Sequence, residues 1–294
     1  MTTPLQSSNA SPCEIPEEVS SGTTTQSETR DAQPSPLVVG VIGGLGPEAT
    51  LDFFAKVLRA TPAERDQDHL HLIINNNPKV PNRNDAVAGT GPSCGPELAK
   101  SARVLASAGA DLLVMPCNTA HAFEADIRTA TDVPFMSLIN ETVTATRTRH
   151  PHVRKVGLLA TSGCLRAALY QDAFAHAGTE TLEPTGAALE RFMTALYDIK
   201  AGRKEVARAA VLELARALIG EGGEGAEVLI SGCTEVPLVF SAEDIAVPLL
   251  ESTDILAHAV VRAASDPGFT LKHSSNSEGC DDLLQKDLKN TPKK

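Results

Sequence analysis

Hydrophobic and polar positions follow two patterns along the chain. Short aliphatic runs predict strands, and the longer segments between them have helical spacing. This alternation is typical of βα units that build a parallel sheet. Gly109 and Gly178 stand where two of the helices should end. The runs that have the length and aliphatic content of buried parallel strands are 38–42, 70–74, 111–115, 133–136, 155–159, 228–230 and 245–249. The predicted helices are 47–60, 94–108, 119–130, 163–177, 189–199 and 205–219.

An internal repeat divides the folded part into two halves. Gly40 and Gly157 occupy similar strands 117 positions apart, Cys117 and Cys233 are 116 apart, and Pro134 and Pro248 are 114 apart. An array of βα units also produces strands at regular intervals by chance. Because three landmarks keep their spacing, we predict an α/β protein of two pseudo-symmetric lobes, each with a parallel sheet. The expected lobes are 37–149 and 150–252.

The two ends of the chain have a different composition. Residues 1–36 hold 13 Ser or Thr and five Pro, and the chain turns polar again after residue 266. Such segments bury too little apolar surface to offset chain entropy, so we expect disordered tails at 1–36 and 267–294. A Ser/Thr-rich start also suits an organelle transit peptide, but such peptides avoid acidic residues and this one carries five.

Composition and charge narrow the class of function. Hydrophobic residues make up 42% of the 294 residues, enough for real cores, and no apolar run is long enough to span a membrane. The net charge of −11 and 3% aromatic content argue against nucleic acid as a partner. We therefore expect a cytoplasmic protein that binds neither membranes nor nucleic acid, with its cysteines as free thiols.

Two of the six cysteines follow predicted strands at equivalent places in the two halves. Cys117 comes after the run 111–115, and Cys233 comes after the run 228–230. The carboxyl ends of parallel strands form the ligand-binding edge of a sheet, and a following helix start favours a thiolate. Most intracellular cysteines are only small buried hydrophobes, which is our interpretation of Cys94 and Cys164.

A pair of thiols in one site suggests proton transfer at a chiral carbon. One thiolate could remove the proton from one face while the other thiol returns a proton to the opposite face, without a cofactor. The carbanion would need strong stabilisation by oriented amides and cationic contacts. Backbone N–H groups that start the helices after the cysteines are the candidates, at Asn118, Thr119, Ala120 and Thr234.

Three segments carry a resemblance to a known family. GGLGPEAT at 43–50, PCNTAH at 116–121 and GCTEV at 232–236 resemble the signature segments of the aspartate/glutamate racemases that work without pyridoxal phosphate. The resemblance covers about residues 37–265. It implies two flavodoxin-like lobes with the active site in the cleft between them, a helix near 253–266 that packs back on the first lobe, and a homodimer. It also implies that Cys117 and Cys233 are the catalytic acid and base.

Further site residues are implied by two shorter segments. VPNRN at 80–84 resembles the family's loop that brings an arginine to a substrate carboxylate, which points to Arg83 with Asn82 and Asn84. The family usually has Asp and Thr around that arginine, so the substrate is less certain than the anion contact. IKAG at 199–202 resembles a segment whose lysine lies near the site, which points to Lys200. Two such cations suit aspartate or glutamate as the substrate.

Several alternatives stay open at this point. A relative could use a single thiol to decarboxylate or isomerise a small diacid, or the same scaffold could bind dicarboxylates without catalysis. His121 could reach Cys117, as in a cysteine/histidine hydrolase, although a second thiol is then unexplained. We expect no metal site, because the histidines His69 and His71 lack a third ligand in the sequence.

Overall fold

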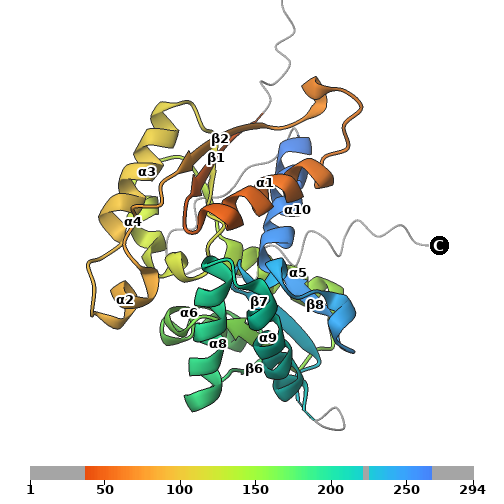
Figure 1. Ribbon diagram of the computed structural model, residues 1–294. Helices are drawn as coiled ribbons and strands as arrows, with labels where there is room; N and C mark the ends of the chain where they lie inside the picture. The colour runs from red at the N-terminus through yellow and green to blue at the C-terminus, as the bar shows by residue number, and fades with distance from the viewer. Residues whose placement is uncertain (1–36, 221–224, 267–294) are drawn as a thin grey trace, which may run out of the picture. The chain divides into compact units, whose positions relative to one another are not determined.

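The computed structural model describes residues 37–220 and 225–266, which form two parallel sheets with the same strand order (Figure 1). The predicted tails at 1–36 and 267–294 lie outside the described residues. The sheets run β2-β1-β3-β4 and β6-β5-β7-β8, and every pairing is parallel. The strands of the first sheet are β1 (Val38–Gly43), β2 (His71–Asn76), β3 (Leu112–Val114) and β4 (Phe135–Met136). Those of the second are β5 (Lys155–Ala160), β6 (Glu180–Leu182), β7 (Val228–Gly232) and β8 (Leu249–Glu251).

Ten α-helices accompany the described strands, together with short 3-10 segments. The helices of the first half are α1 (Pro47–Ala60), α2 (Arg83–Ala88), α3 (Gly95–Ser107), α4 (Glu124–Ala130) and α5 (Leu138–Arg149). The others are α6 (Ser162–Arg166), α7 (Leu169–His176), α8 (Gly186–Lys200), α9 (Lys204–Ile219) and α10 (Ser252–Ser265). The 3-10 segments are η1 (Asp66–Asp68), η2 (Thr119–Phe123), η4 (Val236–Leu238) and η5 (Ala242–Asp244).

The strands alternate their buried side chains between three apolar cores. In β1, Val39 and Val41 enter a core that also receives residues of β5, β7 and helices α1, α5 and α10, whereas Ile42 faces a second core under α3. In β5, Leu158 enters the shared core and Leu159 faces a third core under α8 and α9. Period-two alternation is the normal geometry of a strand. Because β1 and β5 each turn one face toward the shared core, the helices of that core form a layer between the two sheets. This layer joins the lobes.

The internal repeat is visible in the packing of its landmarks. A Cβ at Gly40 would collide with Ala110 and Leu113, each 2.8 Å away. A Cβ at Gly157 would collide in the same way with Ala226 and Leu229. The prolines also match: Leu113 N donates to Pro134 O at 2.8 Å, and Leu229 N donates to Pro248 O at 2.9 Å. The predicted pair of related α/β lobes is confirmed.

Several elements differ from the sequence prediction, which also lacks helices α2 and α5. The segment 119–130 starts as the 3-10 turn η2 and becomes α-helical only at Glu124, and the segment 163–177 is broken at Ala168, whose φ of 51° is left-handed. Apolar spacing continues across that break, so periodicity does not show it. The last strand begins at Leu249 rather than 245, because Pro248 has no N–H for the ladder. The edge strand β6 is half exposed and too polar to be recognised.

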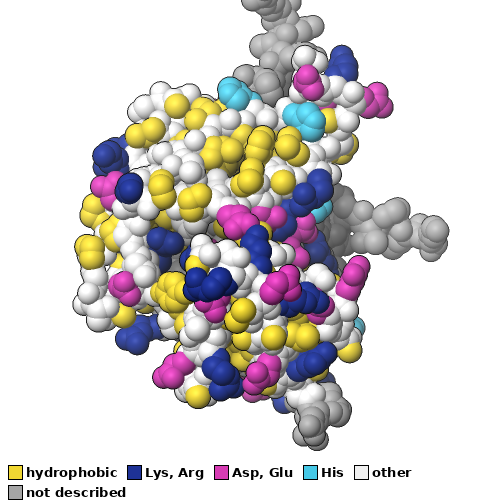
Figure 2. All heavy atoms as spheres, in the orientation of Figure 1, with side chains coloured by type: hydrophobic (Ala, Val, Ile, Leu, Met, Phe, Trp, Pro, Cys, Tyr) yellow, Lys and Arg dark blue, Asp and Glu magenta, His cyan; other side chains and the backbone are white. Residues whose placement is uncertain are grey.

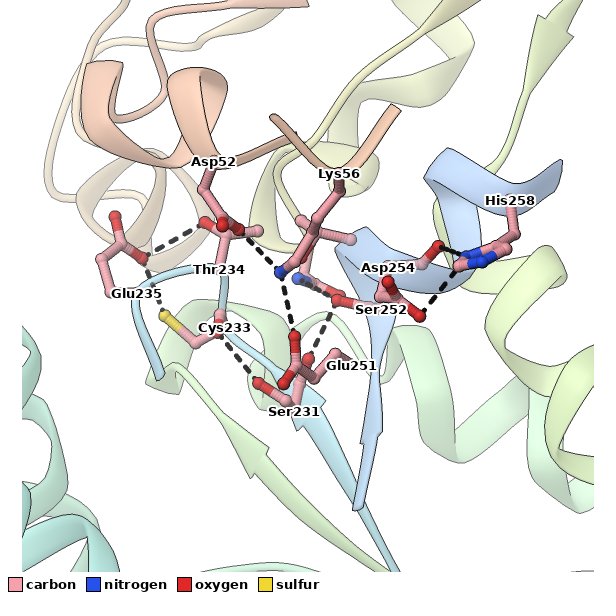
Figure 3. A network of polar contacts seen from close by, with 12 residues as sticks. Asp52, Lys56, Ser231, Cys233, Thr234, Glu235, Glu251, Ser252, Asp254 and His258 are labelled. Atoms are coloured by element: carbon pink, nitrogen blue, oxygen red, sulfur yellow. Dashed lines mark hydrogen bonds and ion pairs between the residues drawn. The ribbon is translucent and has the colours of Figure 1, made fainter. Parts of the chain in front are cut away.

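A buried ion cluster ties the first lobe to the C-terminal elements. Lys56 of α1 is 6% exposed, and its Nζ lies 2.7 Å from Asp52 Oδ2, 2.9 Å from Glu251 Oε2 and 2.9 Å from Thr253 Oγ1 (Figure 3). Three partners match the three donors of a lysine ammonium. Helix α10, which begins beside this cluster, packs against α1 and α5.

Truncating Lys56 should destabilise the fold strongly. Lys56→Ala leaves two carboxylates, 20% and 26% exposed, without their cation, so the cost should approach the lower end of the about 3–5 kcal/mol for breaking a buried pair. The free energy of unfolding from chemical denaturation measures it. Arg191→Ala is the matched control, because the Arg191–Glu213 pair is exposed and should contribute less than about 1 kcal/mol. Equal effects of the two substitutions would contradict the assignment.

Candidate active site

A cavity of about 290 Å³ collects residues from the carboxyl ends of strands in both sheets. The first lobe contributes the loops after β1, β2 and β3, and the second contributes the loops after β5 and β7 together with α8. Such an edge is where open parallel sheets bind ligands. The lining residues are Leu45, Val80, Asn82, Arg83, Asn84, Cys117, Asn118, Thr119, Thr161, Met193, Leu196, Tyr197, Lys200, Gly232, Cys233, Thr234 and Glu235.

The structure brings together nine of the ten residues that the sequence nominates. Cys117 and Cys233 both line the cavity, from equivalent positions after the central strands β3 and β7. Ala120 is the exception: it is fully buried in the core under α3 and is not part of the lining. It packs the segment behind Cys117, because η2 turns its side chain inward.

His121 holds the Cys117 segment in place. Leu138 N donates to its Nε2 at 3.0 Å, so Nε2 is an acceptor, and the proton on Nδ1 is directed at Cys117 O at 2.8 Å. Burial lowers the pKa of His121, which keeps the ring neutral. Both nitrogens are therefore occupied by backbone groups, and neither faces the Cys117 thiol as a base. This arrangement disfavours the cysteine/histidine hydrolase.

Asn118 is also held by its side chain. Its Nδ2 donates to Ser252 Oγ at 3.1 Å, and its Oδ1 accepts from Tyr170 Oη at 2.6 Å. Ser252 in turn donates to Ser231 O at 2.9 Å (Figure 3). All members of this network are buried, so the loop after β3 is fixed to α7 and to the end of β7.

Only some of the N–H donors of Arg83 are hydrogen-bonded within the protein. Its Nη1 donates to Pro81 O at 3.0 Å and more weakly to Val80 O at 3.4 Å, and its Nη2 donates to Leu45 O at 3.0 Å. A guanidinium has five N–H donors. Within the described part of the chain, two N–H groups are left over, Nε–H and one on Nη2, which are enough for one carboxylate. The same bonds tie the loops after β1 and β2 together.

Two hydrogen bonds join the lobes beside the cavity. Asn84 Oδ1 accepts from Gly163 N at 3.0 Å, and the hydroxyls of Thr119 and Thr161 lie 2.7 Å apart. A Cβ at Gly163 would lie 2.6 Å from Asn84 Oδ1, so only glycine allows this approach. Asn82 accepts from Asn84 N at 2.9 Å and caps α2. Asn82 and Asn84 thus position the Arg83 loop.

Glu235 is the residue that sequence reasoning missed. Its Oε2 accepts from Cys233 Sγ at 3.0 Å (Figure 3). Its Oε1 is paired with Lys200. Thr234 Oγ1 makes a longer contact of 3.4 Å to the same Oε2. Glu235 is 6% exposed. It lies inside GCTEV at 232–236, two positions after the thiol, and that spacing is the signal that could have identified it.

The electrostatics of this trio keep Cys233 protonated. Burial raises the pKa of Cys233 well above its usual value, and the negative charge of Glu235 raises it further, while Lys200 opposes the shift. Burial alone would lower the pKa of Lys200, but Glu235 and Cys233 outweigh it and the net direction is upward. At neutral pH Cys233 is therefore a thiol and Lys200 is an ammonium.

The remaining described cysteines lie in the cores. Cys94 and Cys164 are fully buried, and burial raises the pKa of both thiols, that of Cys94 to about 11. Cys94 Sγ donates to Pro81 O at 3.3 Å. Their interpretation as small buried residues is consistent with this setting. Within residues 37–220 and 225–266, no group of three His, Cys, Asp or Glu side chains is placed to hold a metal ion.

The protein has two α/β lobes, and each lobe contributes one cysteine to a shared cavity. Comparison with known proteins gives the family of enzymes to which it belongs. A family model described as Asp/Glu/Hydantoin racemase matches residues 42–260, so the chain belongs to that family. The chain is 27% identical over 233 residues to the broad specificity amino-acid racemase RacX of Bacillus subtilis (strain 168), covering 76% of this chain and 96% of that protein.

Two solved structures show the same architecture. An aspartate racemase from Picrophilus torridus superposes with a TM-score of 0.70 at 27% identity, over 78% of this chain and 94% of that one. A glutamate racemase, isoform RacE1 from Bacillus anthracis, gives a TM-score of 0.60 at 18% identity, over 80% and 83% of the two chains. At this identity the likeness concerns the fold only.

In the part of the chain that the structure describes, no helix is both long and apolar enough to cross a bilayer.

Removing the Glu235 charge should make Cys233 more reactive. In Glu235→Gln the carboxylate that raises the pKa of Cys233 is gone, so the thiolate fraction at a given pH increases and alkylation accelerates several-fold. The rate of iodoacetamide labelling at Cys233, read by peptide mass spectrometry across pH 7–9, measures this. Cys94 in the same digests is the internal control and should keep its rate. An unchanged rate at Cys233 would show that Glu235 does not influence the thiol.

Proposed function

We propose that this protein interconverts the enantiomers of an amino acid by two-thiol proton transfer, with Cys117 and Cys233 as the acid and the base. The observation that carries the proposal is that equivalent cysteines of two equivalent lobes line a single cavity. A structural role would not require the same side chain after both central strands. Membership of a racemase family supports the same reaction.

The reaction conserves all atoms. One cysteine, as a thiolate, takes the α-proton from one face of the substrate, and the electron pair stays on the α-carbon and its carboxylate. The other cysteine, as a thiol, gives its proton to the opposite face. The product is the other enantiomer, and the two thiols have exchanged protonation states. No electron acceptor takes part in these steps.

Cys233 is the better candidate for the resting thiol. It donates to Glu235, and its pKa is raised by burial and by that carboxylate. Cys117 lines the cavity from the other lobe, and His121 contacts its carbonyl rather than its sulfur. We therefore assign Cys233 as the group that first donates a proton and Cys117 as the group that first removes the α-proton. For the reverse reaction, Glu235 positions the Cys233 sulfur, and Lys200 offsets the carboxylate charge.

Arg83 supplies the contact for the substrate's α-carboxylate. Its two spare N–H groups match one carboxylate in bidentate geometry, and this contact withdraws negative charge from the carbanion as it forms. Thr119 and Thr234 flank the thiols and offer hydroxyl and backbone donors. Aspartate or glutamate, the substrate expected from the sequence, stays a prediction, as does the cytoplasmic location.

Replacing either active-site cysteine should abolish racemisation. Loss of one acid or base removes about 10²–10⁴-fold in rate. Formation of the D-enantiomer by chiral chromatography, and α-proton loss by NMR in D₂O, would be followed for Cys117→Ala and Cys233→Ala without added pyridoxal phosphate. Cys164→Ala is the matched control, since that thiol is buried outside the cavity lining.

The pattern of residual activity separates the alternatives. Wild-type racemisation in either variant would overturn the two-thiol mechanism. Release of CO₂ from a diacid in wild type that survives in one of the two variants would instead favour the single-thiol decarboxylase. Binding of the amino acid without exchange of its α-proton would favour the non-catalytic binder.

We also propose that the chain forms a homodimer through the outer surface of α1 and β2. Leu51 and Leu58 of α1 are 66% and 39% exposed, and Ile74 of the edge strand β2 is 36% exposed. Figure 2 shows hydrophobic side chains gathered over these two elements. An apolar patch beside the edge strand of a sheet is a common place for a second copy to dock.

Charges in this patch should separate the dimer. Leu51→Glu combined with Leu58→Glu places two carboxylates in the proposed interface, so the molar mass from light scattering after size exclusion should fall to that of one chain. Val206→Glu is the control, because Val206 is equally exposed at 68% but lies on α9. A wild type that is monomeric at every concentration would contradict the proposed dimer.

A further inference from the structure

We infer that Ser252 is a positioning residue that sets the distance between the two proposed catalytic thiols. The inference rests on the proposed function and deepens it. Ser252 is the first residue of α10, and it is buried outside the cavity lining. It can therefore act on the thiols only through the residues that it contacts.

The Ser252 hydroxyl is bonded to the segments of both cysteines. Its Oγ accepts from Asn118 Nδ2 at 3.1 Å, and Asn118 directly follows Cys117. The same Oγ donates to Ser231 O at 2.9 Å, two residues before Cys233 (Figure 3). A hydroxyl has one proton to donate and two lone pairs, which suits this pair of bonds. One oxygen atom thus connects the segment after β3 to the end of β7.

Further buried bonds hold both ends of this connection. Tyr170 Oη donates to Asn118 Oδ1 at 2.6 Å, which fixes the amide with its N–H toward Ser252. Ser231 Oγ donates to Cys233 O at 3.3 Å. All of these side chains are buried. A bond lost here leaves a polar group without a partner instead of exposing it to bulk water.

Other polar links beside the cavity make a different connection. The hydroxyls of Thr119 and Thr161 lie 2.7 Å apart, and Asn84 Oδ1 accepts from Gly163 N. Both links lead to the segment after β5. Neither reaches β7, the strand that Cys233 follows, so neither fixes the separation of the two thiols directly.

The internal repeat shows that packing does not require a hydroxyl at this place. With the offset of 114 that relates Pro134 to Pro248, Ser252 corresponds to Leu138, the first residue of α5. Leu138 is fully buried in the core shared by the two sheets. An apolar side chain therefore fits the equivalent position of the first lobe, whereas the second lobe has a hydroxyl there.

The separation of the thiols should govern turnover more than binding. Inversion needs one sulfur on each face of the same α-carbon, and a misplacement of about 1 Å can cost about 100-fold in rate. Arg83, the proposed contact for the α-carboxylate, begins α2 and bonds to other backbone groups. Loss of the Ser252 hydroxyl should therefore lower kcat and leave KM nearly unchanged.

Two substitutions of equal volume isolate the hydroxyl. Ser252→Thr keeps it and Ser252→Val does not, while both add the same bulk. We expect kcat for racemisation of L-aspartate or L-glutamate to be about 10–100-fold lower in Ser252→Val, with a similar KM. Ser252→Ala adds no bulk and should behave as Ser252→Val does, which guards against misfolding. Equal kcat in the variants with and without the hydroxyl would overturn the inference.

Thr253→Val is the matched control. It removes the neighbouring buried hydroxyl, which is bonded to Lys56 and not to either cysteine segment. It should lower the melting temperature without changing kcat of the folded enzyme. A loss of kcat equal to that of Ser252→Val would show that any buried hydroxyl of α10 has this effect, and would also overturn the inference.

A measurement without substrate separates this inference from the proposed function. 1,3-Dibromoacetone joins two thiols through three carbons, so the yield of crosslinked Cys117 and Cys233 peptides in mass spectrometry reports the separation of the sulfurs. We expect the yield to be several-fold lower in Ser252→Val than in Ser252→Thr, and equal yields would contradict the role of Ser252. A wild type that racemises neither amino acid would count against the proposed function, and the crosslinking comparison would still decide whether Ser252 sets the spacing.

Discussion

The apolar core shared by the two sheets is the constraint on which the rest of the structure depends. It receives one face of β1 and β3 and one face of β5 and β7, with α1, α5 and α10 in the layer between. Because those four strands are held by one core, the carboxyl ends of the two central strands open into one cavity. The buried Lys56 cluster fixes α1 to the end of β8 and the start of α10 within this arrangement. Two separate lobes with the same sequences at their strand ends would not form the site.

The polar groups around the cavity fall into two sets with different tasks. One set is satisfied within the protein and fixes geometry: His121 and Asn118 hold the Cys117 loop, and Asn84 links the Arg83 loop to the second lobe. The other set keeps donors or charge available for a ligand, as Arg83 does with its two spare N–H groups. Lys200 belongs to both sets, because Glu235 takes one of the three N–H donors of its ammonium.

Most of the fold could be predicted from the sequence, because buried parallel strands and the helices between them have strong apolar patterns. Helix α1 was predicted with its observed bounds, since Pro47 and the following apolar spacing mark it clearly. The prediction failed where local polarity or backbone conformation decides: at the half-exposed β6, at the left-handed Ala168, and at the 3-10 turn that replaces a helix start after Cys117.

Site prediction had a similar limit. Strand-end positions and short motifs nominated nine residues that line one cavity, because topology alone places them there. The partner of each charge could not be predicted. Glu235 lies two positions from Cys233, yet nothing in the pattern says that its carboxylate faces both the thiol and an ammonium 35 residues earlier in the chain. Ala120 was nominated for its backbone N–H, and that role stays a prediction, although η2 turns its side chain into the core.

The two halves of the site are equivalent in backbone but not in chemistry, since the repeat that matches Cys117 to Cys233 matches Thr119 to Glu235. The L- and D-substrates would therefore meet different acid–base partners. Enantiomers have equal free energies in water, so thermodynamics requires the same kcat/KM in both directions whatever the asymmetry of the protein. The difference between the thiols can then emerge only as a compensating change in turnover number and Michaelis constant, with one enantiomer bound more tightly and converted more slowly than its mirror image.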